Sequence, residues 1–251
     1  MKKQIILTIV LFLSMSTWSL TPKEIIHLSE TKYNGEQSSY VEMTMQIVRP
    51  RYTRSIGVKN WLAKENGEQK SLALITSPAK EKGQSFLKDG SQLWNWNPTI
   101  RRLIKLPPSM MSQGWMGSDV SNDEILKEFS LEVDYTHRLI GEEVIDGYSC
   151  YHIELLPKED ADVTWGKIEM WIAKEAYYQM KACYFDEEMY LVKTHRASKI
   201  TDFDGRKLPS VLEILPEEDP DNKTIMTIHK MTFNQKVKGR FFTQQNMKRV
   251  K

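Results

Sequence analysis

The residues that could do chemistry are few and lie far apart along the chain. The sequence contains no G-x-S-x-G, H-E-x-x-H, C-x-x-C or G-x-x-x-x-G-K-[ST] motif, so the common hydrolase, zinc, redox and phosphate-binding templates are absent. Ser118 and Asp119 could suggest a nucleophile, but these residue types are also common in turns and caps before a helix. We therefore expect no enzyme active site, no metal and no cofactor. The histidines stand apart from one another, at positions 27, 137, 152, 195 and 229.

Two further chemical signals have structural explanations. Asp202, Asp204 and Gly205 begin like a calcium loop, but the third acidic position and the closing glutamate are missing, so a hairpin turn is expected. Cys150 and Cys183 fall on predicted strands that are two apart and out of register. Because a disulfide needs Cα atoms within about 7 Å, we favour two separate thiols over a bridge.

The apolar side chains are more distinctive. The chain has 13 methionines and 7 tryptophans, and flexible thioethers allow a surface to adapt to varied apolar ligands. An ordinary methionine-rich core is the alternative. The candidates for an apolar binding surface lie in a predicted strand and in a Met- and Trp-rich loop: Met43, Met45, Met110, Met111, Trp115 and Met116.

Composition excludes several classes of protein. Seven Trp, ten Tyr and eight Phe in 251 residues are too many for a disordered chain, and two cysteines are too few for a disulfide scaffold. A mean hydropathy of −0.49 excludes a protein with many membrane spans. The formal net charge of +2 supplies no basic field, so no nucleic-acid partner is expected.

The first 19 residues have the features of a cleaved secretion signal. Two lysines precede an apolar stretch over residues 5–13, and Thr17 and Ser19 occupy the −3 and −1 positions of a cleavage point. The stretch is too short for a membrane span, although an uncleaved anchor is the alternative. We expect residues 1–19 to be removed and residues 20–251 to form a single secreted domain.

The predicted elements are one helix followed mostly by strands. Thr21, Pro22 and Glu24 form a capping box that begins a helix ending near residue 34, and a second box at Ser121 and Glu124 begins a short helix over residues 122–129. Period-two patterns and hairpin signals predict a mainly β (α+β) fold built on a single curved antiparallel sheet. The expected strands are 40–48, 54–64, 70–77, 84–88, 91–96, 100–106, 131–140, 148–156, 166–173, 178–185, 189–200, 207–215 and 223–234.

One stretch carries a resemblance to a known family. Residues 89–98, DGSQLWNWNP, resemble the D-G-x-x-L-W-x-[YW]-N-P hairpin of the periplasmic lipoprotein carrier LolA. With Arg101-Arg102, the loop containing Pro107, and Gly117-Ser118-Asp119, the segment is similar to a LolA-like subfamily labelled outer-membrane lipoprotein-sorting protein. In this hairpin Leu93 points to one face of the sheet, and Trp94 and Trp96 point to the other.

The resemblance implies a carrier. The family fold is an unclosed barrel whose hydrophobic concavity is covered by helices and a loop, and it carries lipids or lipid-modified proteins across the periplasm. Each acyl CH₂ costs about 0.8 kcal/mol to expose to water, so such a hollow removes most of the barrier to transfer. The implied partners are lipid or lipoprotein cargo, an inner-membrane transporter as donor and an outer-membrane acceptor. Leu93, Trp94 and Trp96 join the candidate ligand residues, and Arg101, Arg102, Ser118 and Asp119 are candidates for a lid anchor or headgroup contact.

The sequence departs from the lipoprotein carrier at one point. There an Arg-Pro pair before the strand preceding the hairpin helps to close the lid, whereas this chain has residues 69–72, QKSL, and its Arg49-Pro50 pair lies one strand earlier. This weakens the expectation of a dedicated lipoprotein cargo. Two alternatives remain: a sensor or adaptor for an inner-membrane exporter of the RND type, and a lipid hydrolase that uses Ser118, Asp119 and a distant histidine.

Overall fold

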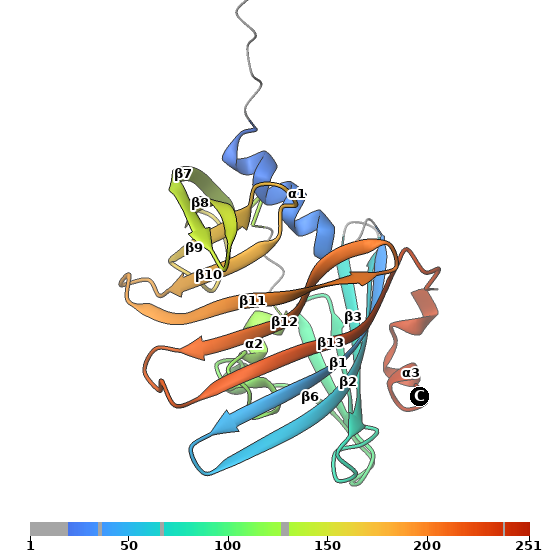
Figure 1. The fold of residues 1–251 in the computed structure, drawn as a ribbon. Helices are drawn as coiled ribbons and strands as arrows, with labels where there is room; N and C mark the ends of the chain where they lie inside the picture. The colour runs from blue at the N-terminus through green and yellow to red at the C-terminus, as the bar shows by residue number, and fades with distance from the viewer. Residues whose placement is uncertain (1–19, 35–36, 66–67, 127–130, 238) are drawn as a thin grey trace, which may run out of the picture.

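The computed structural model describes residues 20–34, 37–65, 68–126, 131–237 and 239–251. The predicted signal peptide, the Asn66-Gly67 turn and the end of the second predicted helix lie outside these residues. Thirteen strands and a few short helices make up the described chain (Figure 1). The helical elements are α1 (Pro22–Asn34), η1 (Pro108–Met110), η2 (Trp115–Gly117), α2 (Asn122–Leu126), η3 (Gly239–Phe241) and α3 (Gln244–Met247).

All strands belong to one antiparallel sheet. Its order is β6-β5-β4-β3-β2-β1-β13-β12-β11-β10-β9-β8-β7, so β6 and β7 are the two edges and the barrel is not closed. This confirms the single antiparallel sheet that the pattern predicts and the unclosed half-barrel that the resemblance implies. The strands are β1 (Ser38–Arg49), β2 (Tyr52–Glu65), β3 (Glu68–Ser77), β4 (Ser85–Asp89), β5 (Gln92–Asn97), β6 (Arg102–Lys105), β7 (Tyr135–Ile145), β8 (Tyr148–Pro157), β9 (Lys167–Ala173), β10 (Gln179–Phe185), β11 (Leu191–Phe203), β12 (Arg206–Pro216) and β13 (Lys223–Phe233).

The pairing of β1 with β13 joins the two halves of the sheet. Ten residues of β1 pair with β13, from Ser39↔Phe233 to Val48↔Lys223. Every other neighbouring pair is made by strands that follow each other in the chain. The sheet is thus two meanders, one from β1 to β6 and one from β7 to β13, and this long-range pairing brings residues of both halves to one curved surface.

Local sequence signals act as expected at most turns and caps. The Thr21 backbone N–H donates to Glu24 Oε2 at 2.7 Å, and Ser121 N–H donates to Glu124 Oε2 at 2.8 Å, so both predicted capping boxes are confirmed. The turn between β4 and β5 differs in detail: Asp89 pairs with Gln92, so Gly90, with φ of 55°, opens the two-residue loop.

The two faces of the sheet are covered by different segments. We call the face that contacts α1 and residues 107–126 the inner face, and we call residues 107–126 the cover segment. Ile25 and Ile26 of α1 pack on the inner face over β7–β10, and Trp115 of the cover segment packs over β1–β5. On the opposite, outer face, Phe242 and Met247 of the C-terminal segment pack against Leu72 and Leu87. Figure 1 shows α1 and α3 at opposite sides of the sheet.

The two cysteines are separate buried thiols, as expected. Cys150 pairs with Ala173 of β9, whereas Cys183 pairs with Glu169 of the same strand, so the two cysteines lie on either side of β9 and four positions apart along it.

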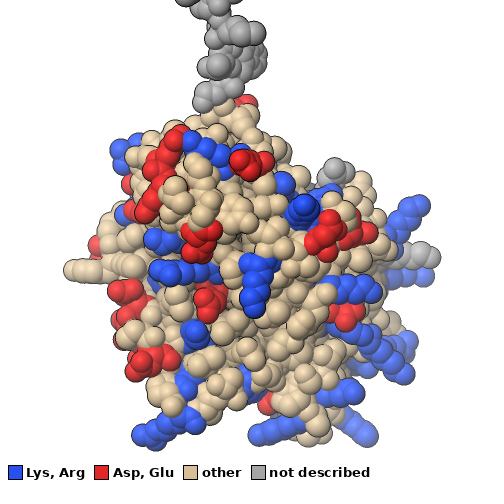
Figure 2. Space-filling view, viewed as in Figure 1, with Lys and Arg blue, Asp and Glu red and all other residues tan. Residues whose placement is uncertain are grey.

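On the face shown in Figure 2, acidic and basic side chains are interspersed over the upper part, and lysine and arginine predominate along the lower and right-hand rim.

Candidate functional site

The inner face of β1–β5 carries an apolar cluster beneath the cover segment. Met45, Ile56 and Ile75 are buried side by side in the sheet, and Phe86 contacts Trp115 edge to face with ring centroids 5.3 Å apart. The alternation of β1 places Met43, Met45 and Ile47 on this face because strand side chains point to opposite sides in turn. The result is an apolar surface with a tryptophan from the cover segment as its roof.

A cavity of about 150 Å³ lies inside this cluster. Met43, Leu93 and Trp115 line its apolar part, and Asn60 and Ser71 add polar atoms. A cavity of similar size in another protein accommodates a benzene-sized molecule. A long acyl chain needs more room, so its entry requires the cover segment to move.

The cover segment folds tightly on itself. A Cβ atom on Gly114 would lie 2.1 Å from the carbonyl oxygen of Ser118, so only glycine fits there. Met116 and Gly117 both have positive φ, of 53° and 81°, and they turn the chain back before α2. These turns direct the Trp115 side chain onto the sheet, where it is 5% exposed.

An ion pair fixes the cover segment to the rim of the sheet. Arg49, at the end of β1, donates from Nη2 to Asp119 Oδ1 at 2.9 Å and from Nη1 to Asp119 Oδ2 at 3.2 Å. Arg49 Nη2 also donates to the Gly117 carbonyl oxygen at 3.0 Å. The Thr224 hydroxyl donates to Asp119 Oδ2 at 2.6 Å and accepts from the Asp119 N–H at 3.0 Å. The Asp119 carboxylate therefore accepts two hydrogen bonds from the Arg49 guanidinium, which is a bidentate and charge-assisted arrangement, and another from the Thr224 hydroxyl.

Two further cations contact the same segment. Arg54 Nη1 donates to the Met116 carbonyl oxygen at 2.9 Å. Lys193 of β11 donates to the Asp119 carbonyl oxygen at 3.0 Å and pairs with Glu124 at 2.6 Å, and its side chain is only 5% exposed. The cover segment is thus bound to β1, β2, β11 and β13 by polar contacts.

These contacts correct one expectation. The sequence comparison placed Arg49-Pro50 one strand too early to hold a lid, yet Arg49 is the residue that pairs with Asp119. The physical reason is the β1–β13 pairing, which puts the end of β1 beside Thr224 and under the cover segment. The position of Arg49 at the end of a long alternating strand was the only sequence signal for this role.

The candidate methionines differ in their placement. Met45 is fully buried in the cluster, and Met43, Met111 and Met116 pack against it. Met110 is 38% exposed, so it lies at the surface of the cover segment. The structure thus brings Met43, Met45, Met111 and Met116 together with Leu93 and Trp115, and leaves Met110 outside.

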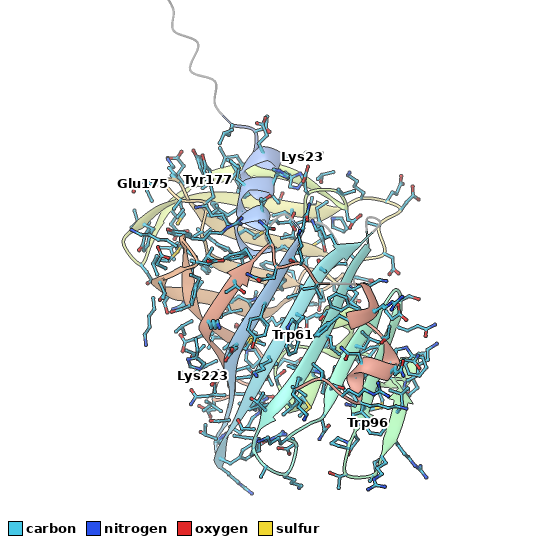
Figure 3. All side chains as sticks on the ribbon, turned by 90° about the vertical axis from the view of Figure 1, so that its right-hand side faces the viewer. Lys23, Trp61, Trp96, Glu175, Tyr177 and Lys223 are labelled. Carbon is cyan, nitrogen blue, oxygen red and sulfur yellow. The ribbon has the colours of Figure 1, made fainter. Side chains whose placement is uncertain are left out.

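Trp94 and Trp96 lie on the outer face. Both pack in the cluster that contains Phe242 and Met247, and Lys248 lies over the Trp96 ring at 5.3 Å (Figure 3). Leu93 points to the inner face because it alternates with them along β5. The two tryptophans therefore support the C-terminal segment and lie away from the inner cavity.

The polar residues that we expected to anchor a lid or contact a headgroup do not lie together. Asp119 is held as described, and the Ser118 hydroxyl donates within the cover segment, to the Val120 carbonyl oxygen at 3.4 Å. Arg101 and Arg102 are exposed at the turn between β5 and β6, where Arg101 has a φ of 52°. The side chains that contact Asp119 come from Arg49 and Thr224 instead.

A second wall of the inner face had no signal in the sequence. Trp165, Tyr184 and His195 form a ladder of rings, with centroids 5.2 Å apart for Trp165 and Tyr184 and 4.4 Å apart for Tyr184 and His195. Burial and the nearby Lys193 ammonium lower the pKa of His195 to about 3, so the imidazole is neutral. Lys193 lies over the Trp165 ring at 5.1 Å and connects this wall to the cover segment.

Two negative findings apply to the described residues. They contain no group of three or more His, Cys, Asp or Glu side chains that could hold a metal ion. Within the same residues, no helix combines the length and the apolar character needed to cross a bilayer.

Comparison with known proteins identifies the family. A family model described as uncharacterized-protein-like matches residues 67–249. No curated protein matches the chain significantly. Three solved structures share its fold over nearly their whole length. A DUF1329 family protein from Desulfovibrio piger is 21% identical, with a TM-score of 0.79, covering 90% of this chain and 97% of that one.

The other two structures are named after lipoprotein sorting or LolA. A domain from Vibrio parahaemolyticus, named for outer-membrane lipoprotein sorting, is 19% identical with a TM-score of 0.78, covering 91% of this chain and 98% of its own. A LolA superfamily protein from Nitrosomonas europaea is 22% identical with a TM-score of 0.73, covering 90% and 99%. The chain belongs to the family that the matching model describes, and its fold is that of the LolA-like outer-membrane lipoprotein-sorting proteins.

Proposed function

We propose that this protein is a periplasmic carrier that binds the acyl chains of a lipid or lipoprotein on the inner face of its half-barrel and transfers them between membranes. The observation that carries the proposal is the apolar cavity around Met43, Leu93 and Trp115, roofed by a segment that polar contacts hold in place. Residues 20–251 would act as one domain after removal of residues 1–19, receiving cargo from an inner-membrane transporter and delivering it to an outer-membrane acceptor.

The composition of the site favours binding over chemistry. The side chains around the cavity are mainly methionine, aromatic and aliphatic, which suits a chain of methylene groups; Asn60, Ser71 and Lys88 are its polar members. Burying each methylene recovers about 0.8 kcal/mol, so even a few methylenes give useful affinity without any reaction.

The cover segment gives the carrier a way to open. Its contacts with Arg49, Arg54 and Lys193 can be exchanged for water at modest cost, whereas apolar burial cannot be replaced by water. Opening would admit an acyl chain that the closed cavity is too small to hold.

Two neighbouring methionines provide the test. Met111 packs on the apolar cluster, whereas Met110 is exposed, so Met111→Asp and Met110→Asp make the same change inside and outside the site. The protein is purified from periplasm without detergent and weighed by native and denaturing mass spectrometry. We expect a bound lipid or acylated peptide on the wild type and on Met110→Asp. Its retention on Met111→Asp should fall at least about tenfold, because a carboxylate in an apolar site is costly.

The outcome separates the carrier from its alternatives. Full retention by Met111→Asp would reject the apolar cluster beneath the cover segment as the cargo site. A wild type that carries no lipid and binds no fluorescent fatty acid would reject the carrier and favour an exporter adaptor. Cleavage of a bound lipid on long incubation would favour a hydrolase.

A further inference from the structure

Basic side chains gather at one end of the sheet. The loop between β3 and β4 and the turn between β5 and β6 leave the sheet at the same end, because consecutive strands are antiparallel. The two connections also touch, since a Cβ atom on Gly83 would lie 3.3 Å from Pro98 Cγ. We call the exposed cations of these connections and of β6 the basic rim: Lys80, Lys82, Arg101, Arg102 and Lys105.

The charge of the basic rim is not neutralised by carboxylates of the described chain. Within the described residues, its side chains form no ion pair and no hydrogen bond. Glu81, between the two lysines, is paired instead with Arg54 at 3.0 Å. The neighbouring C-terminal segment adds Lys248, which lies over the Trp96 ring, and the exposed Arg249. This end of the sheet therefore carries a local excess of positive charge.

The compensating negative charge lies in the other half of the sheet. The loops β10–β11 and β12–β13 contain no lysine or arginine and carry Asp186, Glu187, Glu188, Glu217, Glu218, Asp219 and Asp221. Figure 2 shows acidic side chains at the left, and lysine and arginine side chains that project from the lower and right-hand rim. Because the whole chain has a formal net charge of only +2, an anionic partner is attracted to this part of the surface rather than to the molecule as a whole.

Apolar side chains stand among these cations. Ile100 and Ile104 are 54% and 40% exposed, and they flank Arg101 and Arg102 in the chain. Basic and apolar side chains together suit the interface of a bilayer, where phosphate groups lie above acyl chains. The residues project from a turn and an edge strand, which fits a broad surface.

The basic rim adjoins the segment that is expected to open. Arg54 donates to the Met116 carbonyl oxygen of the cover segment at 2.9 Å and pairs with Glu81, which lies between two lysines of the rim. We propose that the basic rim docks on a bilayer surface rich in anionic lipid, and that docking brings the cover segment to the membrane. This inference rests on the proposed carrier function and names the surface at which the carrier exchanges its cargo.

Vesicles of defined charge test the docking. The protein is mixed with vesicles of phosphatidylcholine alone or of phosphatidylcholine and phosphatidylglycerol, and the bound fraction is measured by flotation. We expect binding to the vesicles that contain phosphatidylglycerol and little binding to the neutral ones. Binding should fall as the salt concentration rises from about 0.1 M to about 1 M, because the Debye length falls from about 10 Å to about 3 Å.

Two double variants with the same loss of charge supply the contrast. Arg101→Gln with Arg102→Gln should lower binding to anionic vesicles about 10- to 30-fold, since each cation near the surface contributes about fivefold. Arg196→Gln with Lys207→Gln removes two exposed cations of β11 and β12 and should bind as the wild type does. Ile100→Ser should weaken binding about three- to tenfold and leave its salt dependence unchanged, because it removes apolar contact alone.

The results separate docking from cargo binding. No binding to anionic vesicles at low salt overturns the docking and favours an acidic protein as the partner of the basic rim. Equal binding to both kinds of vesicle overturns the role of charge, and equal losses in the two double variants overturn the location. The carrier function fails separately, if the wild type carries no lipid and binds no fluorescent fatty acid.

Discussion

Helix α1 and the cover segment lie on the same face of the sheet but are held in different ways. Ile25 and Ile26 of α1 are 1% and 0% exposed and pack into a cluster with Tyr135 and Ile153. In the cover segment Trp115 is buried, and Met111, Met116 and Ile125 pack against the same apolar cluster while only partly buried. Ion pairs and hydrogen bonds to its backbone and carboxylates supply the remaining contacts.

This difference indicates whether α1 or the cover segment moves away from the inner face. Apolar burial is lost as a whole when a helix leaves its site, because water cannot replace it. Charged hydrogen bonds are replaced by water when they break, so their net contribution is about 1.5–3 kcal/mol each. We therefore expect α1 to act as a permanent part of the core and the cover segment to open. Three predictions test this comparison.

The largest effect is expected at α1. Ile26→Ala should lower the free energy of unfolding by about 2–5 kcal/mol, because it leaves a cavity in a fully buried site. The rate at which a fluorescent naphthylamine dye enters the folded protein should stay at the wild-type value. The control is Ile100→Ala, at a side chain that is 54% exposed, with an expected change within about 0.5 kcal/mol. Faster dye entry in Ile26→Ala would show that α1 also opens.

A smaller effect on stability but a larger one on access is expected at Arg49. Arg49→Leu removes the bidentate contact with Asp119 and should cost about 1.5–3 kcal/mol in a denaturant titration. Stopped-flow fluorescence should show faster dye entry, because the closed cover segment loses an anchor. Arg51→Leu changes an exposed arginine two residues away and should alter neither quantity. Dye entry at the wild-type rate in Arg49→Leu would contradict the assignment of Asp119 as the closing contact.

The effect that is smallest near neutral pH, because it develops only on acidification, concerns the wall formed by Trp165, Tyr184 and His195. The pKa of His195 is about 3 in the folded protein and about 6.5 when unfolded. The unfolded chain therefore binds the extra proton, and the stability provided by neutral His195 is complete above pH 6.5 and lost as the pH falls toward 3.

His195→Phe isolates this contribution. The difference in unfolding free energy between wild type and His195→Phe should change by about 1 kcal/mol per pH unit below 6.5, with the wild type losing more. His137, whose pKa is also lowered by burial, is present in both proteins and cancels. A constant difference between pH 7 and pH 4.5 would show that His195 is exposed to water in the folded state.

Much of the fold follows from local pattern. The capping boxes at Thr21 and Ser121 and twelve of the thirteen predicted strands occur close to the expected residues, whereas β7 begins four residues later than expected and continues to Ile145. These features depend on side chains within a few residues of each other, so the chain specifies them without its tertiary structure.

The site was only partly predictable for the same reason. Alternation shows that Leu93 and Trp94 point to opposite faces, but it does not show which face is hollow. That was decided by the C-terminal segment, which covers the face that carries Trp94 and Trp96, and by the cover segment, which covers the other.

The sequence by itself determined the strands, the helix caps, the two separate thiols and the resemblance to a family. Tertiary structure alone decided that Arg49 meets Asp119, and that Trp165, Tyr184 and His195 stand together. Arg49 and Asp119 are 70 residues apart, and Asp119 and Thr224 are 105 apart. Such contacts depend on the β1–β13 pairing and on the curvature of the sheet, which bring distant segments together by burying apolar surface rather than by any local preference.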